Sequence, residues 1–164
     1  MSERPFFVYG TLRHGERNHE AFLRGRTAAQ EPARLAGALL YDGPGHPYAV
    51  RGAGEVHGEL VTAVPGSYDT LLSVLDGLEG FLGPGHPLNL YEREVGDVVR
   101  LRDGAAVKAW VYVAAASVRP GPLIAGGDWL SRRPPGPPPG PPPGPRPVPG
   151  PPHGPPPPGV PRTP

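Results

Sequence analysis

The chain has 164 residues, of which 28 are proline and 25 are glycine, and its formal net charge at pH 7 is +1. It contains no cysteine, which excludes a disulfide framework, a thiolate nucleophile and any zinc or iron–sulfur site with cysteine ligands. A charge this close to zero is not typical of nucleic-acid-binding proteins, so we expect no nucleic-acid partner.

Proline is concentrated at the C-terminal end of the chain. Residues 134–164 hold 19 of the prolines and 6 of the glycines, whereas residues 1–133 have the composition of an ordinary globular domain. Glycines 136, 140 and 144 of this segment are spaced four residues apart, while a collagen triple helix needs a glycine at every third residue. We therefore expect one domain over residues 1–133 and a disordered polyproline II tail over 134–164. The tail is either a ligand for a protein partner that binds proline-rich segments or a passive solvated extension.

The first apolar run, Phe6 to Tyr9, is predicted to be a buried strand that stops at Gly10. Four apolar residues are too few for the core of a signal peptide, and no later run approaches the length of a transmembrane helix. From these patterns we expect a soluble cytoplasmic protein without a membrane partner.

A short helix and three strands are predicted next. Asn18 is placed to cap a helix from Glu20 to Arg24, with Gly25 at its C-terminal end. Three stretches rich in residues that favour β-structure follow, and glycine-rich turns at 43–45 and 52–54 separate them. The predicted strands are Leu35 to Tyr41, Tyr48 to Val50 and Val56 to Val64.

The second half of the domain begins with a helix from Tyr68 to Leu78, for which Ser67 is a suitable N-cap. Two strands around the Asp103-Gly104 turn then form a predicted hairpin, Tyr91 to Leu101 with Val107 to Val113. Strands outnumber helices and no alternation of strand and helix appears. We therefore predict an α+β fold: a small mixed, mostly antiparallel sheet or barrel flanked by short helices.

Glu79 lies on the apolar side of the predicted helix when residues are placed at about 100° intervals. A buried glutamate needs a partner or a function, because removing its charged form from water is unfavourable. Burial would raise its pKa toward neutrality, as suits a general base. Gly77 and Gly80 leave a second interpretation open, in which the helix frays and Glu79 lies in solvent. Its apolar neighbours on the helix are Tyr68, Leu71, Leu75, Leu78 and Leu82.

Common catalytic motifs are missing from the sequence. The histidines include no HExxH pair, and there is no Gly-x-Ser-x-Gly elbow, Walker lysine loop or Gly-x-Gly-x-x-Gly turn. The remaining interpretations are an enzyme without metal, cofactor or obvious nucleophile, and a non-catalytic binding protein.

Four segments together resemble the gamma-glutamyl cyclotransferase-like family over residues 5–130. The first is Tyr-Gly-Thr-Leu-Arg-His-Gly-Glu-Arg-Asn-His at residues 9–19, and the second is Leu-Asp-Gly-Leu-Glu-Gly-Phe at 75–81 followed by Tyr-Glu-Arg at 91–93. The others are Val-Tyr-Val at 111–113 and Gly-Asp-Trp at 127–129. The first segment looks more like the amine-releasing branch, which includes gamma-glutamylamine and butirosin-type enzymes, than the glutathione-specific branch.

The resemblance implies a small barrel flanked by helices that converts gamma-glutamyl compounds into 5-oxoproline and a freed amine without a cofactor or metal. It leaves open the identity of that amine and the alternative of a non-catalytic pocket domain whose tail recruits a partner. For Tyr91 and Arg93 two roles stay open, bracing the site or a purely structural role, and we expect Asp76 to be solvated or hydrogen-bonded to backbone. The resemblance places the catalytic acid at Glu79 and substrate contacts at Tyr9, Gly10, Thr11, Leu12 and Tyr112.

Overall fold

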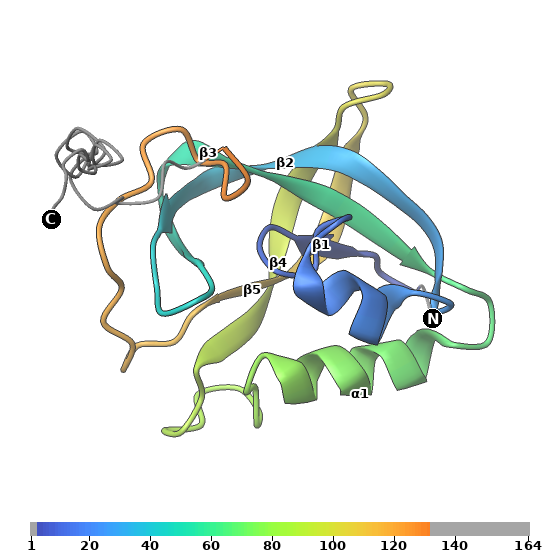
Figure 1. Ribbon diagram of the computed structural model, residues 1–164, viewed down its shortest axis with the longest axis horizontal. Coiled ribbons are helices and arrows are strands. Elements are labelled where there is room, and N and C mark those ends of the chain that lie inside the picture. The colour runs from blue at the N-terminus through green and yellow to red at the C-terminus, as the bar shows by residue number, and fades with distance from the viewer. Residues whose placement is uncertain (1–2, 132–164) are drawn as a thin grey trace, which may run out of the picture. The chain divides into compact units, whose positions relative to one another are not determined.

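The computed structural model describes residues 3–131, and the predicted tail at 134–164 lies outside them (Figure 1). Within this range a closed barrel has the strand order β1-β3-β2-β4-β5. Neighbouring strands are antiparallel except β5 and β1, which close the barrel as a parallel pair. This arrangement confirms the predicted α+β fold. The strands are β1 (Phe6–Val8), β2 (Thr27–Tyr41), β3 (Tyr48–Ala63), β4 (Tyr91–Arg100) and β5 (Ala106–Ala114).

The long β2–β3 hairpin differs from the sequence-based prediction. β2 begins at Thr27, before the predicted start, and β3 runs without a break through the turn predicted at 52–54. A Cβ on Gly52 or Gly54 would approach the side chain of Leu39 to 2.9 or 2.6 Å. The glycines therefore make room for a side chain packed across the hairpin, and the predicted turn is wrong.

The helix predicted at Glu20 to Arg24 is a single π-helical turn, η1 (His19–Leu23). The amide of Arg24 donates to the carbonyl of His19 over 3.1 Å, which gives the turn its five-residue spacing. Contrary to the prediction, the side chain of Asn18 does not cap η1 but donates to Thr11 Oγ1 over 2.7 Å. Asn18 thus ties the residues before η1 to the loop that follows β1.

The helix α1 (Tyr68–Leu78) has the predicted bounds, and Leu71 and Leu75 on its inner face are fully buried. The Ser67 side chain makes no capping bond, although its carbonyl accepts a hydrogen bond from the Leu71 amide at 2.9 Å. α1 contacts η1, and the two lie together on one side of the barrel (Figure 1). None of the helices in residues 3–131 is long and apolar enough to cross a membrane.

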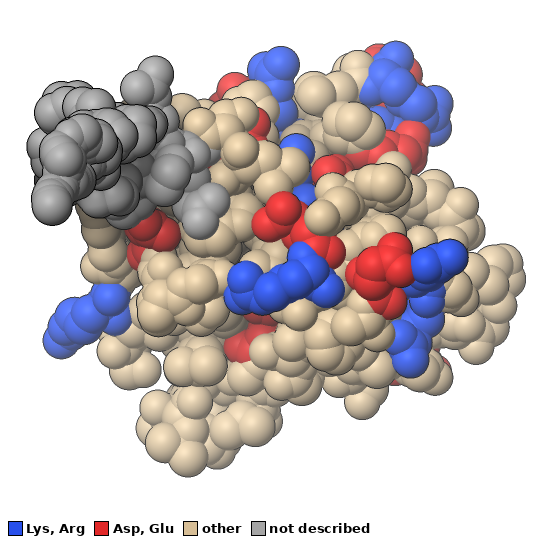
Figure 2. Space-filling view, in the orientation of Figure 1, with Lys and Arg blue, Asp and Glu red and all other residues tan. Residues whose placement is uncertain are grey.

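Charged side chains of both signs lie beside one another on the face shown in Figure 2. Exposed ion pairs also join residues of different strands. Arg51 lies 2.9 Å from Glu94, and Arg34 lies 3.5 Å from Glu55, with all four side chains well exposed. Exposed pairs of this kind contribute at most about 1 kcal/mol each, so the apolar barrel interior supplies most of the stability.

Candidate active site

A cavity of about 130 Å³ lies where β1 ends and α1 ends. The loop after β1, at residues 9–12, forms one wall, and the C-terminal end of α1 forms another. Side chains from β4 and β5, residues of the 43–47 loop, and Arg17 and Asn18 from the segment before η1 also line it. The structure brings all the predicted site residues together around this cavity: Tyr9, Gly10, Thr11, Leu12, Glu79 and Tyr112.

Glu79 is the residue that follows α1, and its amide donates to the carbonyl of Leu75 over 2.9 Å. Its side chain is partly buried and lines the cavity. Among residues 3–131, no group forms a hydrogen bond or ion pair with its carboxylate. Burial raises the pKa of Glu79 from 4.5 to about 7. α1 ends just before Glu79, next to the glycines at which the sequence left fraying open. Glu79 nevertheless lines the cavity, where it can gain or lose a proton near neutral pH.

Three consecutive amides in the 10–12 loop have no hydrogen-bond acceptor within the described residues. The carbonyls of the same loop are used: Gly10 accepts from the Arg13 amide and Thr11 from the Asn18 amide, each at 3.0 Å. The loop is buried and lines the cavity. Successive amides with free N–H groups form a site for a carboxylate or an oxyanion, because buried donors need an acceptor.

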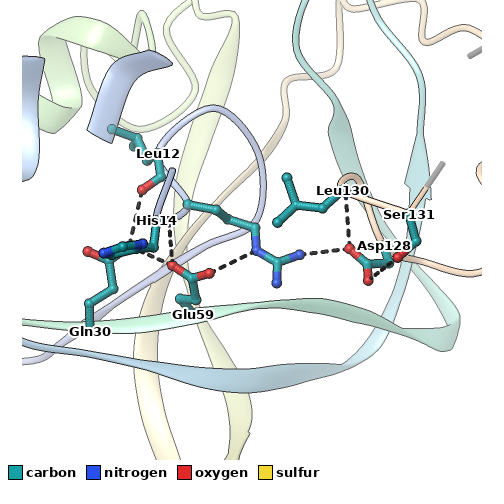
Figure 3. A network of polar contacts seen from close by, with 8 residues as sticks. Leu12, His14, Gln30, Glu59, Asp128, Leu130 and Ser131 are labelled. Atoms are coloured by element: carbon teal, nitrogen blue, oxygen red, sulfur yellow. Dashed lines mark hydrogen bonds and ion pairs between the residues drawn. The ribbon is translucent and has the colours of Figure 1, made fainter. Parts of the chain in front are cut away.

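Glu59 on β3 holds this loop from below, as Figure 3 shows. One carboxylate oxygen accepts from the His14 amide at 2.8 Å and from Gln30 Nε2 at 2.6 Å. Gln30 also donates to the carbonyl of Leu12 over 3.2 Å. The other oxygen lies 3.2 Å from Arg13 Nε. Gln30 on β2 and Glu59 on β3 therefore hold the backbone at Leu12 and His14 in place. Glu59 also pairs with the positive charge of Arg13.

The network continues to the C-terminal segment of the described chain. Arg13 donates to Asp128 over 2.8 Å, and Asp128 also accepts from the Leu130 amide and the Ser131 hydroxyl (Figure 3). Sequence reasoning missed Glu59 and Gln30. The signal available for Glu59 was an acid within an apolar strand, the same kind of anomaly that identified Glu79.

The tyrosines around the cavity hold its walls through their hydroxyl groups. Tyr9 donates to the Tyr112 carbonyl at 2.5 Å and accepts from the Ala49 amide at 3.1 Å. Tyr112 donates to Asp76, which also lies 2.9 Å from Arg93. Asp76 is partly exposed, and contrary to expectation its carboxylate pairs with two side chains rather than with backbone. Burial raises the pKa of Tyr9 and, more than any other effect, that of Tyr112, so both keep their protons.

The mouth of the cavity is formed in part by the loop between β2 and β3. Tyr91 donates to the Pro47 carbonyl over 2.6 Å and lies 2.8 Å from His46 Nδ1, and its ring stacks on Tyr48. Arg17 donates to the Gly45 carbonyl at 2.7 Å. Tyr91 thus braces this loop, one of the two roles that the sequence left open for it.

No cluster of three or more His, Asp or Glu side chains suited to a metal ion occurs in residues 3–131. The described residues around this cavity provide one acid with a pKa of about 7, three amides without an acceptor and protonated tyrosines.

The profile of the family described as gamma-glutamyl cyclotransferase, AIG2-like, matches residues 6–131. The chain belongs to this family. Among solved structures, an AIG2-like protein from Mus musculus has the same fold, with a TM-score of 0.57 and 24% sequence identity. That comparison covers 79% of this chain and 84% of the mouse protein.

Two named relatives are more similar in sequence. Gamma-L-glutamyl-butirosin B gamma-glutamyl cyclotransferase from Niallia circulans is 36% identical over 107 residues. The match covers 65% of this chain and 64% of that enzyme, so the chain spans slightly less than two thirds of its length. A protein from Vibrio cholerae with the name "Putative gamma-glutamylcyclotransferase" is 35% identical over 126 residues, 77% of this chain and 95% of its own length.

Proposed function

We propose that this protein is a gamma-glutamyl cyclotransferase, which releases 5-oxoproline and a free amine or amino acid from a small gamma-glutamyl compound. The observation that carries the proposal is the carboxylate of Glu79, which has no hydrogen-bond or ion-pair partner in residues 3–131 and shares one small cavity with the free amides of Gly10, Thr11 and Leu12. The relative from Niallia circulans, named for the same chemistry, supports it.

The reaction does not require a nucleophile from the protein, which fits a chain without cysteine. The substrate's α-amine attacks its own γ-carbonyl carbon, a five-membered lactam closes, and the bond from that carbon to the leaving nitrogen breaks. Holding the chain folded is effective, since well-oriented intramolecular reactions reach effective molarities of about 10⁵ to 10⁸ M. The walls braced by Tyr9 and Tyr112 supply the rigid surface that this folding needs.

Glu79 is the general base and then the general acid in this mechanism. The substrate amine enters as an ammonium with three protons, of which one stays on the lactam nitrogen. Glu79 transfers the other two in turn to the leaving nitrogen, which departs as an ammonium. A carboxylate with a pKa near 7 suits both roles, because proton transfer is most effective when the pKa lies near the working pH.

The free amides at 10–12 bind negative charge, either the α-carboxylate of the glutamyl group or the oxyanion that develops on the γ-carbonyl oxygen. Either role lowers the barrier only if the loop is fixed before the substrate binds. The bonds from Glu59 and Gln30 to this loop provide that rigidity.

The test is an assay of the full chain with a panel of gamma-glutamyl amino acids and amines, in which 5-oxoproline is measured by mass spectrometry. We expect product with the wild type and a loss of at least about 100-fold in Glu79→Gln. Glu94→Gln is the matched control, since it removes an exposed carboxylate outside the cavity. Undiminished product in Glu79→Gln would refute the assignment of the base. A panel that stays unreacted with folded wild-type protein would favour a non-catalytic pocket domain.

A further inference from the structure

Arg17 is the arginine among the residues that line the cavity, and it lies at the exposed mouth. One guanidinium nitrogen donates to the carbonyl of Gly45 over 2.7 Å, which holds the side chain against the 43–47 loop. No carboxylate in residues 3–131 forms an ion pair with it. A guanidinium has five N–H donors in a planar fork, so most of its capacity to bind an anion is unused.

Arg17 lies nearer the surface than the groups that would bind the glutamyl part of the substrate. Residues 10–12 are buried, and Glu79 is partly buried, whereas Arg17 is exposed. The glutamyl chain has to enter deeply to bring its amine to Glu79. A cavity of about 130 Å³ is smaller than the roughly 300 Å³ or more of typical ligand pockets, so the leaving group extends to the mouth.

The charges at the mouth favour an anion there. His46, the neighbour of Arg17 in the lining, has its pKa lowered by burial and also by the charge of Arg17. It lies 2.8 Å from the hydroxyl of Tyr91 and contributes no negative charge. Among residues 3–131 the single acid in the lining is Glu79, which belongs to the deep part of the cavity. A polycationic amine at the mouth would face Arg17, which no carboxylate in residues 3–131 pairs with.

We propose that Arg17 recognises the α-carboxylate of the leaving group, so that the preferred substrates are gamma-glutamyl amino acids rather than gamma-glutamyl derivatives of cationic amines. This inference rests on the proposed cyclotransferase function. The leaving group of this chain would then be an amino acid. That is a different chemical class from butirosin B, the compound in the name of the relative from Niallia circulans. Arg17 acts as a specificity residue, and it takes no part in proton transfer.

The experiment compares gamma-glutamyl-alanine with gamma-glutamyl-ethylamine, whose leaving group is alanine without its carboxylate, and with gamma-glutamyl-putrescine. The wild type, Arg17→Gln and Arg24→Gln are assayed as full chains for kcat/KM with each compound. Arg24 is a matched control because it is exposed, lies one residue beyond η1 and does not line the cavity. Dissociation constants for the same compounds are measured in the Glu79→Gln background, in which binding is read without turnover.

In the wild type we expect gamma-glutamyl-alanine to exceed gamma-glutamyl-ethylamine by about five- to tenfold, with the putrescine compound poorest. Arg17→Gln brings the alanine-to-ethylamine ratio to about one, and Arg24→Gln retains it. The ratio also falls as ionic strength rises from about 0.05 to 0.5 M, since added salt screens an exposed charge.

Three results would overturn the proposal. An alanine-to-ethylamine ratio unchanged by Arg17→Gln would show that Arg17 does not recognise the carboxylate of the leaving group. An equal loss for both compounds would place Arg17 on the glutamyl part instead. A wild type that prefers the putrescine compound would contradict the charge argument. If no compound reacts, the cyclotransferase function fails, while the ratio of dissociation constants still decides the role of Arg17.

Discussion

Gly10 and Pro47 pack so closely that a Cβ on Gly10 would lie 2.7 Å from Pro47 Cδ and 2.9 Å from Pro47 Cγ. Gly10 is the first residue of the loop with free amides, and Pro47 belongs to the loop at the mouth. The hydroxyl of Tyr91 holds the carbonyl of Pro47. The deep wall and the mouth of the cavity are therefore one packed unit, in which a movement of either loop displaces the other.

Gly10→Ala should accordingly lower both stability and activity. The proline ring cannot move aside as a flexible side chain would, so the added methyl forces the two loops apart, at a cost of about 1–3 kcal/mol in the free energy of unfolding. We expect kcat/KM with a reactive gamma-glutamyl compound to fall about tenfold or more. Urea denaturation and steady-state assays measure the two effects.

Gly77→Ala is the matched control for that change. Gly77 lies in α1, its φ is not positive, and a Cβ added there would meet no atom within 4 Å. Alanine there should stabilise the protein by about 0.5–1 kcal/mol, because it favours the helix more than glycine does. A Gly10→Ala protein as stable and active as the wild type would contradict the packing argument.

The ion pair beneath the loop is open to a similar test. Glu59→Gln removes the charge that pairs with Arg13 and weakens the bond to the His14 amide, so we expect a loss of about 1–3 kcal/mol in stability. We also expect at least a tenfold loss in kcat/KM, because the free amides are no longer fixed. Glu55→Gln, at an exposed pair on the same strand, should change stability by less than about 0.5 kcal/mol. Equal effects from the two changes would show that Glu59 has no special role.

The sequence predicted the parts of the molecule that depend on local pattern. The bounds of α1 follow from its apolar periodicity, and Glu79 was identified because an acid interrupts that apolar face. The hairpin of β4 and β5 follows from a turn flanked by two strand-forming runs.

The parts that failed depend on contacts between distant residues. Glycine marks a turn and a close approach equally well, so the pattern at 52–54 could not reveal that Leu39 packs there. Asn18 is a good cap in isolation, but in the folded protein its side chain donates a hydrogen bond to the hydroxyl of Thr11 instead. Glu59 and Gln30 meet because β2 and β3 pair in one register, which no local pattern specifies.

The pH dependence of the reaction tests Glu79 as the base. With a pKa of about 7, its basic form is scarce in acid, so kcat/KM should rise about tenfold per pH unit below neutrality and level off above about pH 7. The measurement is kcat/KM between about pH 5 and pH 9 with a substrate whose leaving group does not titrate in that range. A profile that is flat down to about pH 5 would exclude Glu79 as the titrating base.

The same carboxyl links folding to pH. Its pKa rises from 4.5 in the unfolded chain to about 7 in the folded protein, so the folded state holds the proton more tightly. This contribution to stability is fully present below about pH 4.5 and is lost as the pH rises through about 7, because the buried group then has to ionise. Glutamine at this position does not titrate. The stability of Glu79→Gln relative to the wild type should therefore increase by about 1–3 kcal/mol when the pH is raised from 5 to 8.

Denaturant titrations of the wild type and Glu79→Gln at both pH values measure this difference, and Glu94→Gln controls for the loss of a surface carboxylate. A gap between the wild type and Glu79→Gln that stays constant with pH would mean that the carboxyl is solvated in the folded protein. In that case burial could not tune Glu79 for proton transfer, and the proposed catalytic role would lose its physical basis even if the fold and the family stand.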